Sequence, residues 1–323
     1  MKTIRIIEVP SELGAGTRGA SLGIDALKVA AFNAKNAFFT QFPKTKVSTF
    51  NELLYEHSPY RWAKYIDGIE KVFTNIINSV TESINNNEFP LLIAGDHSNA
   101  AATIAGLRKA YPNDKIGVIW VDAHADLHTP YTSPTGNMHG MPLAIALGEE
   151  NLSNRKNPVS DKTAAYWERL KSVGSPTPWI RHEDIVFIAI RDLEFEEVDL
   201  INKHSIKNIL VEEVRTKGAS HTAQKTLALL KDCDRIYLSF DVDSLDSELV
   251  ADGTGTPVPN GLLPDETTTL LCELLANPKV SCFEVVEINP TLDTQGNKMA
   301  DVSLQILLKA TQQISNRIST VSI

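Results

Sequence analysis

Short apolar runs recur along the 323-residue chain and alternate with longer segments suited to helices. The clearest of these runs are nearly continuous and do not alternate with polar residues: Ile4–Val9, Leu91–Ala94, Ile116–Val121, Ile185–Ile190, Ile236–Phe240 and Phe283–Ile288. Strands of this kind are covered on both faces, and their alternation with helices is typical of a parallel sheet. Between them, Trp62–Asn86 and Thr222–Lys231 have apolar residues near helical spacing and are predicted to be helices. We therefore expect an α/β fold with three layers, α-β-α, around a central, mainly parallel sheet.

No internal repeat, low-complexity tract or linker divides the sequence. The length suits one large domain or two ordinary ones, and without a dividing segment we predict a single domain over residues 1–323. The stretch Glu149–His182 is polar and contains Pro158, Pro176 and Pro178. Such a stretch is typical of an irregular loop, so we expect an excursion on the surface.

Composition and charge exclude several classes of protein. The chain is 42% hydrophobic and 22% charged, as in a globular protein, and its formal net charge of −9 argues against nucleic acid or an anionic membrane as partner. No apolar stretch is long enough for a signal peptide or a membrane span. Cys233, Cys272 and Cys282 are odd in number and lack CxxC spacing, which favours reduced cysteines and a cytoplasmic location.

Polar clusters follow four of the predicted strands directly. They are GDHS at residues 95–98, DAHAD at 122–126, DVD at 241–243 and EINP at 287–290. Ligands of open parallel sheets bind at the carboxyl ends of the strands. We therefore expect these clusters to converge on one edge of the sheet although they are far apart in the sequence.

Three of the clusters contain residues that bind metals: His97, Asp122, His124, Asp126, Asp241 and Asp243. Alternation in an extended segment would project the side chains of each cluster to the same side. Such crowded carboxylates are costly to bury unless cations neutralise them. Six ligands exceed the needs of one tetrahedral zinc but suit two metals that share carboxylates, and an oxygen-rich set favours Mn(II), with Fe, Co or Ni as substitutes. A single DxD or HxD is usually a solvated or capping motif, but three at three strand ends favour a metal site.

The motifs AGDHS, DAHAD and SFDVDSLD together resemble those of the ureohydrolase family, which comprises arginases, agmatinases and formiminoglutamases. The resemblance extends over nearly the whole chain, from GAGTRG at residues 14–19 to EINP, and implies an arginase-like fold. It implies that one Mn(II) is held by His97, Asp122, Asp126 and Asp241. It implies that the second is held by His124, Asp122, Asp241 and Asp243, so that Asp122 and Asp241 bridge the two ions.

The segment TSPTGNMHGMPL at residues 132–143 is similar to that of bacterial arginases. By this resemblance, Thr135 and Asn137 contact the α-carboxylate of the substrate, and His139 shuttles protons. Glu287 matches the carboxylate that receives the guanidinium group, and Thr256, in GTGTP, matches a segment that lines the same pocket.

Two residues depart from the arginase pattern. His128 stands where arginases typically carry an asparagine that binds the α-carboxylate, and a histidine can still donate a hydrogen bond to a carboxylate. Glu194 stands where they carry an aspartate that helps to recognise the α-amino group. These changes leave the chemistry intact and bear on the choice of substrate.

The resemblance and the residues together predict a hydrolase that converts L-arginine and water to L-ornithine and urea. Asp126 would accept a proton from the attacking water, Glu287 would orient the guanidinium group, and His139 would deliver a proton to the leaving amine. The family also implies a trimer or hexamer of identical chains. The alternatives are agmatinase, guanidinobutyrase or formiminoglutamase activity, a metal-dependent deacetylase with one catalytic metal, and an arginine-binding regulator with a broken ligand set.

Overall fold

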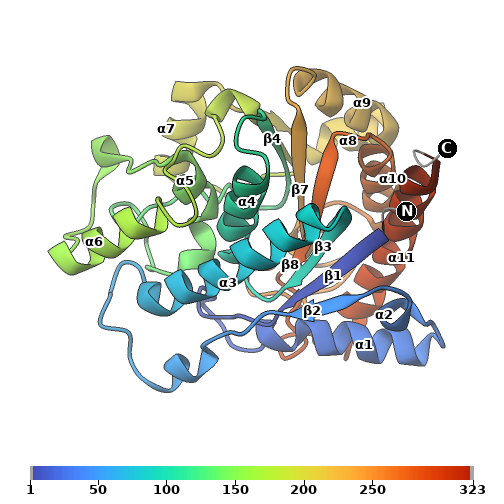
Figure 1. Ribbon diagram of the computed structural model, residues 1–323, viewed down its shortest axis with the longest axis horizontal. Helices are drawn as coiled ribbons and strands as arrows, with labels where there is room; N and C mark the ends of the chain where they lie inside the picture. The colour runs from blue at the N-terminus through green and yellow to red at the C-terminus, as the bar shows by residue number, and fades with distance from the viewer. Residues whose placement is uncertain (1–2, 321–323) are drawn as a thin grey trace.

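The computed structural model describes residues 3–320, within which eight strands form one parallel sheet (Figure 1). The strands are β1 (Thr3–Val9), β2 (Lys44–Lys46), β3 (Glu88–Ala94), β4 (Ile116–Val121), β5 (Ile185–Ile188), β6 (Lys207–Ile209), β7 (Arg235–Asp241) and β8 (Val280–Val286). Their order across the sheet is β2-β1-β3-β8-β7-β4-β5-β6. The expectation of an α/β fold with a parallel sheet is confirmed.

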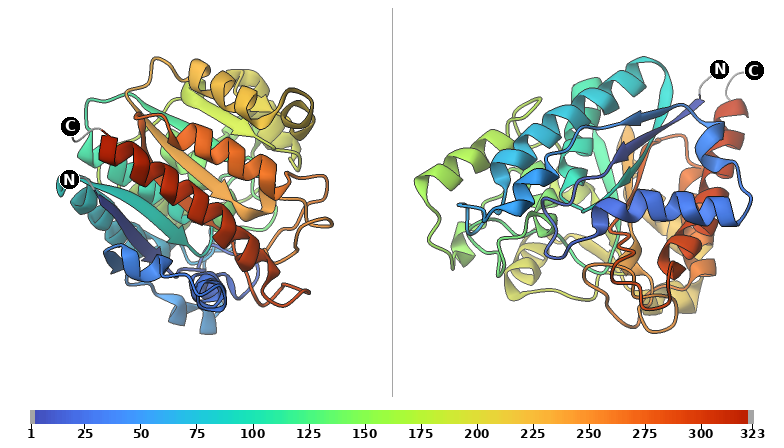
Figure 2. Two further views of the ribbon diagram at one scale, coloured as in Figure 1. Left: turned by 90° about the vertical axis from the view of Figure 1, so that its right-hand side faces the viewer. Right: turned by 90° about the horizontal axis from the view of Figure 1, so that it is seen from below.

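Helices cover both faces of the sheet and form two separate apolar cores. One core contains residues of α1 (Gly23–Asn33), α2 (Phe38–Gln41), α8 (Val211–Lys217), α9 (Ala219–Leu229), α10 (Pro264–Leu275) and α11 (Lys298–Thr320). The other contains residues of α3 (Ile66–Asn85), α4 (Asn99–Ala110), α5 (Pro142–Leu147), α6 (Asp161–Leu170) and α7 (Phe195–His204). Figure 2 shows α10 and α11 lying across the first of these faces. None of the helices within residues 3–320 combines the length and apolar composition needed to cross a bilayer.

The two core faces explain why the strand sequences are nearly continuous in apolar residues. In β4 every residue is buried, with Ile119 and Val121 in one core and Val118 and Trp120 in the other. Successive side chains of a strand point to opposite faces, so a strand covered on both sides needs apolar residues at every position.

Several element boundaries differ from the predictions. The runs predicted as Ile185–Ile190 and Phe283–Ile288 stop being strands at Ile188 and Val286, because Ala189 and Glu287 adopt positive φ angles of 74° and 68°. The helix predicted over Trp62–Asn86 begins at Ile66, and the short edge strands β2 and β6 are additional. These edge strands have mixed polar sequences, so no apolar run marked them.

The interpretation of Glu149–His182 as a surface excursion is correct only in part, because many of its residues are exposed but the segment also packs into a core. This segment contains helix α6, whose N-terminus is capped by the Ser160 hydroxyl accepting a hydrogen bond from the Thr163 backbone N–H. Trp167 and Trp179 are fully buried in the core beneath α3–α7. The prolines and polar residues mark the turns around α6, and the tryptophans provide its packing.

The four strands that carry the polar clusters are neighbours in the sheet. They occupy the consecutive central positions β3-β8-β7-β4, although β8 is the last strand in the sequence. Because all four are parallel, their carboxyl ends lie at one edge. The clusters therefore meet there, as the strand-end pattern predicted.

Candidate metal centre

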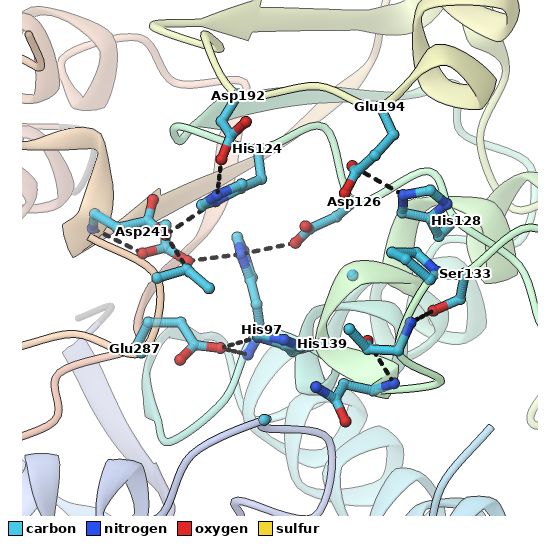
Figure 3. A pocket seen from close by; sticks show the side chains of 18 of the residues that line it. His97, His124, Asp126, His128, Ser133, His139, Asp192, Glu194, Asp241 and Glu287 are labelled. Carbon is cyan, nitrogen blue, oxygen red and sulfur yellow. Dashed lines mark hydrogen bonds and ion pairs between the residues drawn. The ribbon is translucent and has the colours of Figure 1, made fainter. Parts of the chain in front are cut away.

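His97 lies at the centre of the cluster, and its ring is held in place by Trp120 and Ser239. Its ring stacks on Trp120 with centroids 4.1 Å apart, and its Nε2 lies 2.7 Å from the Ser239 hydroxyl. The opposite nitrogen, Nδ1, faces the carboxylates of Asp122, Asp126 and Asp241 at 3.0, 3.1 and 3.0 Å. Because the Ser239 contact uses Nε2, Nδ1 is the nitrogen available to a metal (Figure 3).

A second group of donors adjoins the first. The Nδ1 of His124 lies 3.0 Å from Asp243 Oδ2 and 3.5 Å from Asp122 Oδ1. Asp122 therefore faces both histidines, with Oδ2 toward His97 and Oδ1 toward His124. This is the arrangement that a carboxylate shared by two ions requires.

The side chains converge for a different reason from the one predicted. The prediction that extended segments project them to the same side is wrong. β4 ends at Val121, and Asp126 adopts a left-handed backbone with φ of 52°. After Asp241 the chain turns into the short 3-10 helix Val242–Ser244, in which the Asp243 N–H donates to Asp241 Oδ1 at 2.9 Å. The side chains converge because the backbone turns at each strand end.

The donor set fits divalent cations. His97 Nδ1 and Asp122 Oδ2 are buried and have no hydrogen-bond partner among the described residues, although they face each other and further carboxylates. Burial, together with the charge of Asp122, raises the pKa of Asp126 to about 6, and burial likewise raises that of Asp241. Atoms that share an ion at bonds of about 2.1 Å lie roughly 3 Å apart, as the His97 contacts do. A cation among these atoms would bind the unpartnered nitrogen and oxygen atoms and offset the repulsion between the buried carboxylates.

Glu287 lies beside this donor set because a backbone hydrogen bond of this residue connects the ends of β8 and β3. Its N–H donates to the Gly95 carbonyl at 2.8 Å, which ties the end of β8 to that of β3. Its Oε1 accepts from the His97 backbone N–H at 2.9 Å and lies 3.2 Å from His139 Nδ1. Although burial favours the neutral ring, the hydrogen bond with Glu287 raises the pKa of His139 above its ordinary value. These groups line a cavity of about 370 Å³ that also contains the predicted metal ligands His97, His124, Asp126, Asp241 and Asp243.

The far end of this cavity is built around His128. Its Nε2 lies 3.1 Å from Glu194 Oε2 and 3.6 Å from Glu197 Oε2, and its Nδ1 lies 3.2 Å from the Thr132 hydroxyl. The hydrogen bond with His128 lowers the pKa of Glu194 to about 2, whereas burial raises that of Glu197 to about 8. One ionised carboxylate therefore pairs with His128 at this end.

The remaining predicted contacts also line the cavity. Thr135, Asn137 and Thr256 are among the lining residues. The Thr256 hydroxyl donates to Asp243 Oδ2 at 3.0 Å, so it orients a predicted metal ligand. Asn137 is held by Lys64, whose Nζ donates to Asn137 Oδ1 at 2.9 Å.

Comparison with known proteins identifies the family. A model described as "Arginase family" matches residues 2–312. An arginase from Brevibacillus brevis is 34% identical over 308 residues, covering 95% of this chain and 96% of that protein. The chain belongs to the arginase family. The solved structure of the arginase from Bacillus caldovelox superimposes with a TM-score of 0.79 at 31% identity, covering 96% of this chain and 98% of that one.

A solved structure of lower sequence identity shares the fold. The structure of formimidoylglutamase from Bacillus subtilis superimposes with a TM-score of 0.73 at 20% identity, over 97% of this chain and 87% of that one. The layered parallel sheet is therefore shared with a protein that is named for a different activity. The side chains in the cavity must decide the substrate.

Sequence reasoning missed four residues that line or support the site of this arginase-family chain. Asp192 lies 3.6 Å from His124 Nε2, Glu197 lies beside His128, and Ser239 and Trp120 hold His97. Ser239 lies two residues before Asp241 on β7, and Trp120 lies two residues before Asp122, which follows the end of β4, so the alternation of a strand could have indicated that both lie near a predicted ligand. Nothing in the sequence distinguished Asp192 from other loop aspartates.

Arg191 fastens the segment that carries Asp243 and Thr256. Its guanidinium donates to the carbonyls of Asp243, Val258 and Pro259 at 2.9, 2.8 and 2.9 Å. Lysine cannot reproduce this planar set of donors, so Arg191→Lys is expected to lower metal affinity by about 10–100-fold. Metal retained during titration with a chelator measures the effect. Arg181→Lys, at an exposed arginine, is the control, and equal retention in both variants would contradict the role of Arg191.

Proposed function

We propose that this chain hydrolyses L-arginine to L-ornithine and urea with two Mn(II) ions, acting as a single domain over residues 1–323. The observation that carries the proposal is the position of Glu287: its carboxylate lies in one cavity with five of the six predicted metal ligands. A carboxylate beside a metal-binding cluster suits a planar cation that must be held for attack by water. Membership of the arginase family supports the same reaction.

The metal-binding residues divide into two sets in this proposal. His97, Asp122, Asp126 and Asp241 would hold one ion, and His124, Asp122, Asp241 and Asp243 the other. The contacts of Asp122 with both histidines support its bridging role. When bound, such ions lower the pKa of water toward neutrality and so supply a nucleophile at physiological pH.

The protein's own groups orient the substrate and move protons. Oε1 of Glu287 already accepts two hydrogen bonds, which fixes the carboxylate and leaves Oε2 for the guanidinium group. The Asp126 carboxylate accepts a proton from the attacking water. His139, which touches Glu287, delivers a proton to the leaving amine, and its raised pKa keeps it protonated to higher pH than an ordinary histidine.

The distal end of the cavity would receive the amino-acid portion of arginine. Glu194, ionised and beside His128, would attract the α-amino group, while Thr135 and Asn137, which line the same cavity, would donate to the α-carboxylate. Both ring nitrogens of His128 already face partners, Glu194 and Thr132. His128 would therefore contact the carboxylate only by exchanging one of these partners.

A substrate panel after loading with Mn(II) tests the proposal. We expect urea release to be fastest with L-arginine and slower with agmatine and guanidinobutyrate, which each lack part of the α-amino acid group, and we expect no release of formamide from formiminoglutamate. The absence of urea from arginine would refute the reaction. Two bound metals per chain would separate this enzyme from a deacetylase with one metal.

Lys64 should affect the recognition of the carboxylate end. Its ammonium orients the Asn137 amide, so Lys64→Met is expected to raise KM for arginine about 10-fold with little change in kcat. Agmatine, which lacks the carboxylate, should show no such change. Steady-state kinetics on both substrates measure this, with Lys35→Met at a remote position as control; equal effects on the two substrates would contradict it.

Assembly and location belong to the same proposal. The family resemblance supports a trimer or hexamer of identical chains and a cytoplasmic enzyme that acts on a small molecule, without nucleic acid or membrane as partner. Sedimentation of the Mn(II)-loaded protein would measure the assembly.

A further inference from the structure

A second cluster of metal-binding side chains lies away from the cavity. It comprises Glu149, His182 and His204, whose ligand atoms all lie within 4.8 Å of one another. Glu149 follows the end of α5, His182 lies just before β5, and His204 is the last residue of α7. Because the cavity is at the carboxyl ends of the strands and His182 precedes the amino end of β5, this cluster belongs to the opposite edge of the sheet.

The two histidines stack on each other, and their Nε2 atoms make no hydrogen bond within the described residues. Their rings are stacked, with centroids 3.6 Å apart and planes inclined by 8°. Both Nε2 atoms are buried and have no hydrogen-bond partner among the described residues. Buried polar atoms are normally paired, so two unpartnered imidazole nitrogens in one place call for a ligand.

The carboxylate completes the donor set. Glu149 Oε1 accepts from the backbone N–H groups of Glu150 and Asn151 at 3.0 and 2.7 Å, which fixes the side chain. Its other oxygen, Oε2, lies 3.6 Å from His182 Nε2, too far for a hydrogen bond. One oxygen thus holds the carboxylate in position and the other remains available.

We propose that Glu149, His182 and His204 form a third cation site, selective for Zn(II) or a similar late first-row ion, that joins the ends of α5 and α7 to the start of β5. Two imidazoles and one carboxylate are a typical set for such ions, with water as the fourth ligand. The partial exposure of Glu149 and His182, 18% and 20%, admits that water. The carboxyl end of α7 adds the negative end of the helix dipole at His204.

Binding requires a small rearrangement. Donors of a tetrahedral ion with bonds of about 2.1 Å lie roughly 3.4 Å apart. The separation of 3.6 Å between Glu149 Oε2 and His182 Nε2 is already close to this value, and the separations from His204, which are at most 4.8 Å, must close by up to roughly 1.4 Å. The two rings must also tilt from their stacked arrangement so that each lone pair points at the ion.

The site has a structural consequence for the cavity. α5 follows the segment with His139, and α7 begins next to Glu194 and carries Glu197. α5 begins two residues after Gly140 and α7 begins directly after Glu194, both of which line the cavity, and the two helices end at or near residues of the cluster. A cation there would brace the two helices at the ends far from the substrate.

Metal analysis of the holoenzyme tests the proposal. Protein loaded with Mn(II) is incubated with a small excess of Zn(II), freed of unbound metal and analysed for both elements. We expect about one more Zn(II) per chain in the wild type than in His204→Gln or His182→Gln, with total metal otherwise equal. Comparison between variants removes any exchange of Zn(II) for Mn(II) at the cavity, because those ligands are unchanged.

His221→Gln, at an exposed histidine of α9, is the matched control and should bind as much Zn(II) as the wild type. Zn(II) should also raise the Tm of the wild type by a few degrees relative to His204→Gln, since a ligand that binds only the folded state stabilises it. Should either histidine variant be unstable, Glu149→Gln serves in its place. Equal Zn(II) content and equal Tm shifts in wild type and variants would overturn the proposal.

Discussion

Replacing Asp122 with asparagine is expected to abolish tight binding of both metals and to lower kcat/KM for arginine by well over 100-fold. Asp122 presents one oxygen to His97 at 3.0 Å and the other to His124 at 3.5 Å. Asparagine has the same shape but only one oxygen and no charge, so it can bind at most one of the two ions, and only through a neutral oxygen. Loss of a residue that merely orients a ligand typically costs 10–100-fold, and loss of a shared ligand should cost more.

Metal content per chain and arginine kinetics measure this result together. Asp25→Asn, at a carboxylate that is 69% exposed on α1, is the control and should retain both metals and full activity. Two tightly bound ions in Asp122→Asn would exclude the bridging role. The circular dichroism spectrum and Tm of the variant show whether the fold is intact, because a misfolded protein would lose metal for another reason.

Replacing Glu287 with glutamine should leave both metals bound and still lower kcat/KM for arginine by roughly 100-fold or more. Glutamine can continue to accept the hydrogen bond from the His97 backbone, so the metal-binding side of the site is preserved. It cannot offer two anionic oxygens, and each charge-assisted hydrogen bond to the guanidinium group is worth about 1.5–3 kcal/mol. The variant should therefore lose turnover while it keeps both metals.

This combination separates a substrate-binding carboxylate from a metal ligand. Glu287→Gln with two ions and little activity supports the proposed role, and full activity would remove Glu287 from the substrate site. Glu212→Gln, at an exposed carboxylate of α8, controls for the change of charge and should behave as the wild type. Reduced metal content in Glu287→Gln would instead indicate that its contact with His97 positions that ligand.

Sequence reasoning reached the metal-binding residues because each lies at the end of a strongly apolar strand. The β3 and β4 sequences run without interruption into the motifs that contain His97 and Asp122. An apolar run followed by histidine and aspartate is a local pattern, and parallel strands necessarily bring their carboxyl ends to one edge. The geometric reason given for the orientation of Asp126 was nevertheless wrong, because its positive φ depends on packing that no local pattern reports.

Residues that act from other elements could not be found in this way. Arg191 fastens the loop around Val258 through backbone carbonyls, and Lys64 reaches Asn137 across 73 positions of sequence. Neither stands in a motif, and a carbonyl partner leaves no trace in the sequence. The buried Trp167 shows the same limit, since a polar stretch with prolines concealed a packed helix.

The sequence by itself determined the α/β class, the parallel sheet and the six candidate metal ligands. Hydrophobic runs and ligand chemistry are properties of neighbouring residues, and the six residues were read from short segments. Only the tertiary structure decided that β8 lies between β3 and β7, which sets Glu287 against His97, and that Glu149, His182 and His204 meet at the opposite edge. These juxtapositions depend on strand order and helix packing, which sum weak contacts over the whole chain and are not encoded in any one segment.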